Sequence, residues 1–317
     1  MCGGNGIDAA DRRETMTAKR TIPFLLTRRN LKKIKTRTVA VPAAAIFELP
    51  ERVLQFGTGA LLRGLPAWCI DKANRRGIFN GRIVAVTSGD ETDPLTAQDG
   101  LYTICERAAA KTGTTASFVI NAAISRVLNE SLHWDLILRC AANPEMQIVV
   151  AQTNAADLVL KKDNVHWQPP KSFPGKLLAF LYHRFKHFNG AAGSGMVIIH
   201  STGPEQPKGL DAIVLELAHQ NGLETAFLDW LEASNHFCNS VADRMVLNSI
   251  SPQQQKELEK MTGYKDELLV ITESYRNWCI ETNNKSVQKI LSFSQADPGV
   301  VLSPQLSSFG KMKPIRG

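Results

Sequence analysis

The sequence has no apolar run long enough to span a membrane, and it opens with no secretory signal pattern. None of its six cysteines forms a C-x-x-C pair, which argues against a zinc site and for reduced thiols in a cytoplasmic setting. His183 and His187 have metal-ligand spacing, but Arg184 and Lys186 lie between them, so a solvated basic face is expected instead. No P-loop and no G-x-S-x-G elbow occur. We therefore expect a globular protein without a membrane partner or a metal.

The net charge of +7 comes entirely from one end of the chain, and the rest of the chain has no excess of basic residues. Residues 1–40 hold ten basic and three acidic residues, whereas residues 41–317 hold 27 of each. We expect residues 1–40 to form a basic leader that is partly disordered. Residues 26–37 could pack on the domain as a short basic helix, touch nucleic acid, or act as a targeting peptide. Packing is favoured after about Thr27, since no aromatic residues interleave this run to stack on bases, and no nucleic-acid partner is expected.

A short apolar run, a glycine turn and an amphipathic run follow one another at residues 52–76. Residues 53–56 are typical of a strand buried on both faces. Gly57 would allow a tight turn, and Gly59 would let the backbone approach a pyrophosphate at the start of a helix. The pattern indicates the first half of a dinucleotide-binding unit. Leu62 stands where G-x-G-x-x-G has its third glycine, so a purely structural turn is the alternative.

A second predicted strand, residues 82–87, lies downstream of the glycines and is followed by acidic residues. Asp90, Glu91 and Asp93 come where a carboxylate would bind the adenosine ribose of a cofactor, and Asp90 is the first choice. Because such a cluster would repel a 2′-phosphate, it favours NAD over NADP. Arg63 and nearby lysines oppose this preference.

Strand and helix signals alternate along the rest of residues 41–210. They predict strands at 101–105, 116–120, 146–151 and 195–200, and helices at 131–142 and 172–188, the last with Ser172 as N-cap. This alternation favours an α/β fold with a doubly wound, Rossmann-type sheet over residues 41–245. Later segments predict helices at 210–220, 223–233, 254–262, 268–281 and 285–293. Residues 246–317 are therefore expected to be a mostly helical segment, the truncated start of a substrate domain.

The glycine stretch and several later segments resemble the mannitol dehydrogenase family of long-chain, metal-independent polyol dehydrogenases. The segments are residues 56–64 (FGTGALLRG), 98–103 (QDGLYT), 169–180 (PPKSFPGKLLAF), 235–240 (NHFCNS), 243–244 (DR) and 296–300 (ADPGV). Within the family, the chain is most similar to the tagaturonate reductase, or altronate oxidoreductase, subgroup. The resemblance covers about residues 41–309 and implies a Rossmann-type fold.

The resemblance also implies an NAD-dependent oxidoreductase that interconverts D-altronate and D-tagaturonate in hexuronate catabolism. Together with the strand and turn pattern above, it assigns cofactor binding to Phe56, Gly57, Thr58, Gly59, Ala60, Arg63, Asp90, Thr153 and Asn154, where Asn154 replaces a glutamate of the family. The residues alone support only a small, polar, anionic substrate. Lys171 and Lys176 are possible partners for its carboxylate, although lysines at a helix start are usually exposed. The oligomeric state is left open.

For the general base, the resemblance points to Lys313, with Asp243 and Arg244 orienting it and bridging two domains. A structural ion pair is an equally good interpretation of Asp243 and Arg244, and a solvated surface position is the ordinary one for Lys313. The asparagine and histidine that follow this lysine in the family would lie beyond Gly317. We therefore expect the chain to be weakly active or inactive, with a non-catalytic dinucleotide-binding remnant or interaction module as the alternative.

Overall fold

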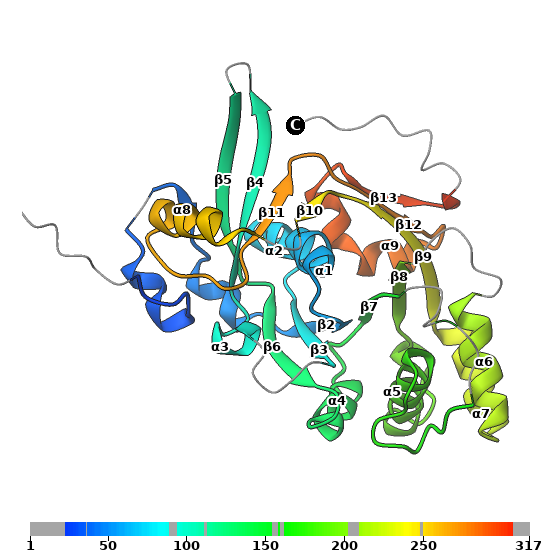
Figure 1. The fold of residues 1–317 in the computed structure, drawn as a ribbon. Coiled ribbons are helices and arrows are strands. Elements are labelled where there is room, and N and C mark those ends of the chain that lie inside the picture. Colours follow the sequence, from blue (N-terminus) through cyan, green and yellow to red (C-terminus); the bar gives the residue numbers. More distant parts are fainter. Residues whose placement is uncertain are drawn as a thin grey trace, which may run out of the picture.

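The computed structural model describes residues 23–35, 37–88, 94–110, 113–153, 158, 162–201, 209–247 and 250–306. These residues form one sheet of eight strands and another of five, with helices packed against both faces of the larger sheet (Figure 1). Residues 1–20, expected to be disordered, lie outside the described ranges. Within those ranges, no helix has the length and apolar character that crossing a membrane requires.

Six parallel strands form the centre of the large sheet. Their order across it is β6 (Ile124–Asn129), β3 (Arg82–Thr87), β2 (Glu51–Phe56), β7 (Ile148–Gln152), β8 (Val197–Ser201) and β9 (His236–Asp243). This is the strand order of the doubly wound Rossmann fold, which reverses between β2 and β7. The sheet continues through β12 (Asn277–Glu281), antiparallel to β9, and ends at β13 (Val300–Ser303). The predicted α/β fold of Rossmann type is confirmed, and β2 lies in the interior of the sheet.

Apolar side chains cover both faces of the large sheet, because successive residues of a strand point to opposite sides. Leu54 of β2 joins a core with α4 (Trp134–Ala141), α5 (Phe173–His187), α6 (Leu210–Gln220) and α7 (Thr225–Ser234). Val53 joins the core on the other face, with α1 (Ala60–Gly64), α2 (Pro66–Arg75), α9 (Lys285–Ile290) and the 3-10 helix η5 (Ser292–Ala296). The sheet is therefore buried on both sides, as its near-continuous apolar strands require.

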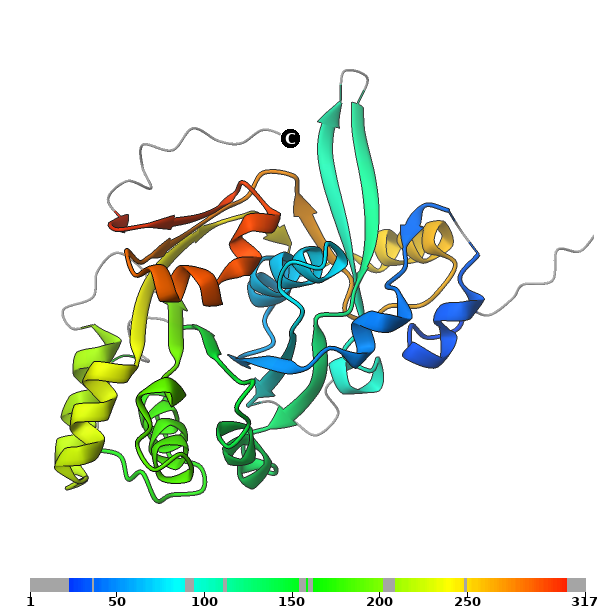
Figure 2. The ribbon, with the colours of Figure 1, turned by 180° about the vertical axis from the view of Figure 1, so that it is seen from behind.

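The smaller sheet is built around a long hairpin inserted between β3 and β6. Its strand order is β1 (Val39–Ala40), β5 (Gly113–Asn121), β4 (Tyr102–Ala110), β11 (Val270–Glu273) and β10 (Val246–Leu247). The far end of the β4–β5 hairpin stands clear of the rest of the molecule in both views (Figures 1 and 2). A single turn, α3 (Pro94–Ala97), precedes β4.

The segment before β2 packs on the smaller sheet. Leu26 is fully buried in a core that includes Tyr264, and its N–H donates to the carbonyl of Lys265 at 2.8 Å. The backbone N–H of Arg28 donates to the carboxylate of Asp99 at 2.9 Å. This core is flanked by η1 (Arg28–Lys33), η2 (Ala44–Glu48) and α8 (Pro252–Thr262). Elsewhere, the short 3-10 helix η4 (Ala192–Ser194) precedes β8. The prediction that the leader packs on the domain after about Thr27 is confirmed, although its short helix is of the 3-10 type.

Residues 246–306 contain strands as well as helices. The helix predicted over 268–281 is wrong, because this stretch holds β11 and β12. In each of these strands at least three consecutive residues are buried, which a strand inside a sheet allows and a surface helix does not. The strand predicted at 195–200 is β8, and five further strands, β9 to β13, follow it where only helices were predicted. These later strands complete both sheets, so the division into two domains at residue 245 stays a prediction.

Arg244 connects the two sheets through one buried guanidinium group. From the end of β9, its Nη2 donates to the carboxylate of Glu106 in β4 at 2.7 Å and to Thr272 Oγ1 in β11 at 2.9 Å. Its Nη1 donates to the carbonyl of Gly64 at the end of α1. The same guanidinium lies 4.5 Å from the ring centroid of Trp68 in α2. Arg244 therefore fixes α1 and both sheets relative to one another.

Replacing Arg244 by Ala should lower the free energy of unfolding by about 3 kcal/mol, because a buried charge pair with Glu106 is broken and several acceptors lose their donor. The matched control is Arg139→Ala, which removes an exposed ion pair with Asp135. That change should cost less than about 0.5 kcal/mol. Urea unfolding followed by circular dichroism measures both, and equal effects would contradict the role given to Arg244.

Candidate functional site

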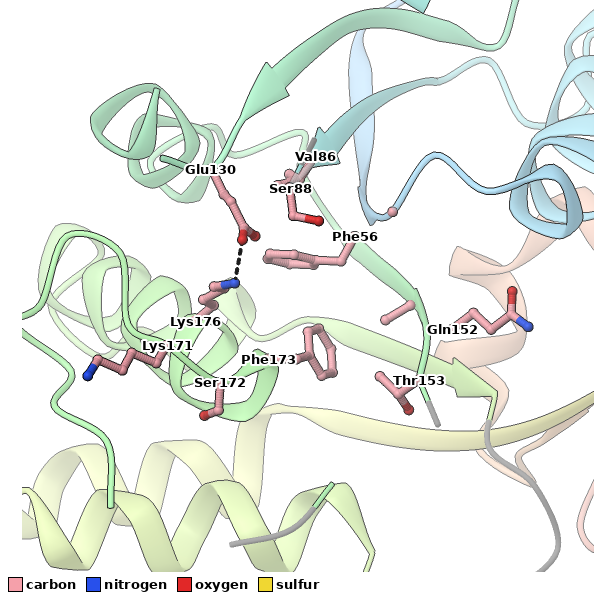
Figure 3. A pocket seen from close by; sticks show the side chains of 12 residues that line it. Phe56, Val86, Ser88, Glu130, Gln152, Thr153, Lys171, Ser172, Phe173 and Lys176 are labelled. Atoms are coloured by element: carbon pink, nitrogen blue, oxygen red, sulfur yellow. Dashed lines mark hydrogen bonds and ion pairs between the residues drawn. The ribbon is translucent and has the colours of Figure 1, made fainter. Parts of the chain in front are cut away.

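A pocket of about 300 Å³ opens at the carboxyl ends of β2, β3 and β7. These strands flank the point where the strand order reverses, and there open α/β sheets leave a crevice for ligands. The pocket is shown in Figure 3 and is lined by Phe56, Gly57, Val86, Ser88, Glu130, Ala151, Gln152, Thr153, Lys171, Ser172, Phe173 and Lys176. The fold thus brings the glycine turn together with the start of α5, more than a hundred residues later.

Gly57 makes the turn that ends β2. Its φ is +107°, a backbone conformation that side-chain-bearing residues rarely adopt. Its N–H donates to the carbonyl of Val86 in β3 at 2.8 Å, and a Cβ at this position would lie 2.8 Å from Leu62 Cδ1. The side chain of Leu62 therefore packs against the turn from inside. This packing accounts for a leucine where the dinucleotide motif has its third glycine.

The backbone after Gly57 offers hydrogen-bond donors that the described part of the protein does not use. The N–H groups of Thr58, Gly59 and Ala60 donate to no acceptor among the described residues. A Cβ built on Gly59 would meet no atom within 4 Å, so the space beside this residue is open. Unused N–H groups beside open space are what binding of an anionic group such as a pyrophosphate requires.

Side chains on both sides hold the glycine turn in place. Gln55 Nε2 donates to the carbonyl of Gly57 at 2.9 Å, and Arg63 Nε donates to the carbonyl of Thr58 at 3.1 Å. Arg63 also donates to the carbonyl of Leu268, just before β11. Arg63 was predicted to contact a cofactor. The structure shows it bound to main-chain carbonyls, outside the pocket lining, where it shapes the turn.

Two aromatic rings and one unpaired hydroxyl make up the centre of the pocket. The rings of Phe56 and Phe173 meet edge to face, with centroids 5.3 Å apart. Thr153 Oγ1 is buried and has no hydrogen-bond partner among the described residues, a costly state that a ligand would relieve. Asp90 and Asn154, also predicted here, lie outside the described residues. Two aromatic rings, an orphan hydroxyl and the free backbone N–H groups beside the pocket together fit an adenine dinucleotide.

A nearly buried ion pair also lines the pocket. Lys176 Nζ lies 2.7 Å from Glu130 Oε1, and the two side chains are only 12% and 16% exposed. The expectation of an exposed lysine is therefore wrong for Lys176. Lys171 is exposed, as expected. Its ammonium group lies 4.9 Å from the ring centroid of Trp167. The sequence analysis did not identify Glu130 as a pocket residue, because it follows β6. Buried and partly exposed residues are mixed in this strand, so its hydrophobic pattern in the sequence is weak.

The start of α5 is held by its N-cap, and this N-cap and the first turn supply the lining residues Ser172, Phe173 and Lys176. Ser172 Oγ accepts a hydrogen bond from the N–H of Gly175 at 3.0 Å, so the predicted N-cap is confirmed. The carboxylate of Asp163 accepts in turn from the N–H and the hydroxyl of Ser172, each at 2.7 Å. A capped and braced helix start keeps Phe173 and Lys176 in position before any ligand arrives.

The predicted catalytic residues do not line this pocket. Asp243 accepts a hydrogen bond from the hydroxyl of Tyr275 at 2.8 Å, and Arg244 makes the contacts between the sheets described above. Lys313 lies outside the described residues. Their catalytic roles stay predictions, and the ion pair of Arg244 is formed with Glu106 rather than with Asp243. Within the described ranges, no group of three or more potential ligand side chains could hold a metal ion.

The neighbouring strand β8 ends with a buried histidine that the sequence analysis did not single out. Burial lowers the pKa of His200 to about 4, and Asp211 only partly opposes this effect. The imidazole is therefore neutral at pH 7, and its Nδ1 has no partner among the described residues. Ser201 follows it and shares a 2.7 Å hydrogen bond with Ser240 of β9. These polar groups lie on β8 and β9, whereas β3 and β6 lie on the other side of the point between β2 and β7 where the strand order reverses.

The sequence matches known proteins over most of its length. Residues 51–292 match the family model described as the mannitol dehydrogenase Rossmann domain. The chain is 37% identical over 254 residues to altronate oxidoreductase of Halalkalibacterium halodurans, covering 78% of this chain and 49% of that protein. It is 34% identical over 242 residues to altronate oxidoreductase of Bacillus subtilis, covering 74% and 49%. The chain thus spans about half the length of these curated relatives, and the resemblance found in the sequence is confirmed.

Solved structures show the same fold. Mannitol 2-dehydrogenase of Pseudomonas fluorescens, in a ternary complex with NAD and D-mannitol, superposes with a TM-score of 0.73 at 20% identity, covering 92% of this chain and 60% of that chain. A D-sorbitol dehydrogenase in its substrate-free form gives a TM-score of 0.69 at 18% identity, covering 90% and 60%. At these identities the likeness concerns the fold.

Replacing Gly59 by Val should weaken dinucleotide binding without harming the fold. The side chain would enter open space beside the free N–H groups and keep the ligand away from them. Losing one or two charge-assisted bonds costs about 1.5 to 3 kcal/mol, or roughly ten- to a hundredfold in affinity. Gly193→Val is the matched control, since its Cβ also meets nothing within 4 Å and it lies in η4, before the start of β8 and away from the glycine turn. Calorimetric titration with NAD measures both, and similar losses in both variants would contradict the assignment.

Proposed function

The chain belongs to the mannitol dehydrogenase family, and on this premise we propose that it binds NAD in the pocket between β2, β3 and β7. We further propose that it serves the NAD-linked interconversion of D-altronate and D-tagaturonate. The observation that carries the proposal is the glycine turn with unused N–H groups at the point where the strand order reverses. The substrate follows from the names of the relatives, which are altronate oxidoreductases.

The glycine turn and the pocket beside it would contact different parts of the cofactor. The N–H groups of residues 58–60 would bind the pyrophosphate, and the rings of Phe56 and Phe173 would pack against the adenosine. Thr153 would supply its unpaired hydroxyl to a polar group of the ligand. When bound, NAD accepts or returns the hydride. The protein holds it in place and keeps water from the apolar part of the pocket.

NAD is favoured over NADP by the charges around the pocket. The acidic cluster at Asp90, Glu91 and Asp93 follows β3, where the ribose of the adenosine would be bound, and it would repel a 2′-phosphate. The lysines that line the pocket are engaged elsewhere, Lys176 with Glu130 and Lys171 over an indole ring. Neither lysine is therefore an unpaired cation that would attract an additional phosphate.

For the reaction itself, we propose that Lys313 is the general base and that Asp243 and Arg244 are positioning residues. A lysine near other cations or in a poorly hydrated site has a lowered pKa, which suits it to accept the hydroxyl proton near neutral pH. The second candidate is a non-catalytic dinucleotide-binding module. It is favoured by one observation, namely that Asp243 and Arg244 already have partners within the protein. The predicted cytoplasmic location also stays a proposal.

NADH binding and NADH oxidation separate these functions. We expect NADH to bind with enhancement of its fluorescence, and more tightly than NADPH, because of the acidic cluster after β3. Oxidation of NADH on addition of tagaturonate, with fructose as the control substrate, would support the dehydrogenase. Binding without turnover on either compound would support the non-catalytic module. Failure to bind NADH at all would contradict both.

A further inference from the structure

We propose that Glu130 and Lys176 together recognise the 6-amino edge of the adenine base, so that the pocket selects adenine over hypoxanthine or guanine. The inference rests on the proposed function, since it assumes that a dinucleotide binds here. It goes beyond that function by naming the residues that read the base. In this arrangement, the carboxylate of Glu130 accepts from the 6-amino group and the ammonium group of Lys176 donates to the adjacent ring nitrogen.

The place of the pair in the fold indicates the base-binding end of the site. Val86 and Ser88, which close β3, line the same pocket, and the end of this strand is where the adenosine ribose of a dinucleotide is bound. Glu130 directly follows β6, the next strand outward, and its N–H donates to the carbonyl of Thr87 at 2.9 Å. Lys176 comes from the first turns of α5 across the crevice. The pair therefore lies on the adenosine side of the switch point.

The surroundings of the pair are those of a base pocket. In Figure 3 the carboxylate of Glu130 and the ammonium group of Lys176 meet close to the rings of Phe56 and Phe173. Aromatic faces and edges provide stacking for a purine, while a polar pair at their border can bond to the edge of the ring. Both charged side chains are mostly shielded from water, which makes directional bonds to them stronger than at a surface.

The pair retains unused hydrogen-bonding capacity. One oxygen of Glu130 accepts from Lys176, and the other carboxylate oxygen has no partner among the described residues. An ammonium group has three protons, and only the bond to Glu130 is formed by Lys176 within the described ranges. A shielded ion pair with spare donors and acceptors stabilises a fold poorly, because the cost of removing charges from water is not fully offset. A ligand that uses the spare groups would explain why the pair lies inside the pocket.

Adenine has the matching order of groups along its edge. Its 6-amino group donates, and the neighbouring ring nitrogens accept. Hypoxanthine and guanine carry a carbonyl oxygen at position 6, which would face the carboxylate of Glu130 with no proton between them. Sites built to bond a polar group reject an analogue that lacks it strongly, because buried groups are left unpaired. The discrimination should therefore depend on Glu130 more than on any other lining residue.

Calorimetry with NAD and with nicotinamide hypoxanthine dinucleotide tests the inference on the full chain. We expect NAD to bind about five- to a hundredfold more tightly, the range of a good two-point contact to a base edge. Glu130→Gln should bring the ratio of the two affinities close to one, because an amide can donate to the carbonyl oxygen as well as accept. Lys171→Met is the matched control at the rim of the same pocket, and it should leave the ratio unchanged.

The variants also separate this inference from the proposed function. If Glu130→Gln is unstable, the double variant Glu130→Gln/Lys176→Gln replaces the ion pair by a neutral one and should likewise lose the discrimination. Equal binding of both dinucleotides by the unaltered chain overturns the inference while leaving NAD binding intact. The inference is also overturned if Glu130→Gln leaves the ratio of the two affinities unchanged. It is overturned as well if Lys176→Met weakens the binding of NADP alone. No binding of either dinucleotide overturns the proposed function and the inference together.

Discussion

The connections that leave β2 and β7 run to opposite faces of the large sheet, and the candidate site depends on this constraint. β2 leads into α1 and α2 on one face, while β7 leads to α5 on the other. Right-handed crossovers on both faces force the loops after these adjacent strands apart, which leaves a crevice at their carboxyl ends. The glycine turn occupies one side of this crevice and the capped start of α5 the other.

The site is held in its shape before a ligand binds. Gln55 and Arg63 fix the carbonyls of the glycine turn, and Asp163 fixes the start of α5. Further out, the guanidinium of Arg244 joins α1 to both sheets. Such preorganisation reduces the ordering cost of binding, so that more of the contact energy appears as affinity. It also leaves the base-reading pair of Glu130 and Lys176 facing a pocket whose walls need not move.

The central part of the fold could be predicted from the sequence because its signals are local. Apolar runs at β2, β3, β7 and β8, and the glycine turn between β2 and α1, are each complete within a few residues. β11 and β12 were read as one helix because their apolar residues recur over a length that suits a helix. Only their pairing with β4 and β9, far away in sequence, makes them strands. Glu130 could not be predicted as a pocket residue for a similar reason, because its partner Lys176 is 46 residues away in the sequence.

The residues proposed for the chemistry were harder to place from the sequence than those proposed to bind the cofactor. Phe56, Gly57 and Thr153, which the sequence analysis assigned to a cofactor site, all line the pocket, and the glycine turn after β2 has a backbone signature that a sequence shows. Arg63 and Arg244 were assigned to the site by resemblance, yet their guanidinium groups are bound to protein acceptors that the sequence could not reveal. A charged side chain near a motif is thus a weak guide to its partner.

A crystal structure of the chain grown with NAD would test the central claim most directly. Our account predicts the pyrophosphate against the N–H groups of residues 58–60 and the adenine between Phe56, Phe173 and the Glu130–Lys176 pair. A dinucleotide bound anywhere else on the protein, or one whose adenine projects into solvent away from this pocket, would contradict it.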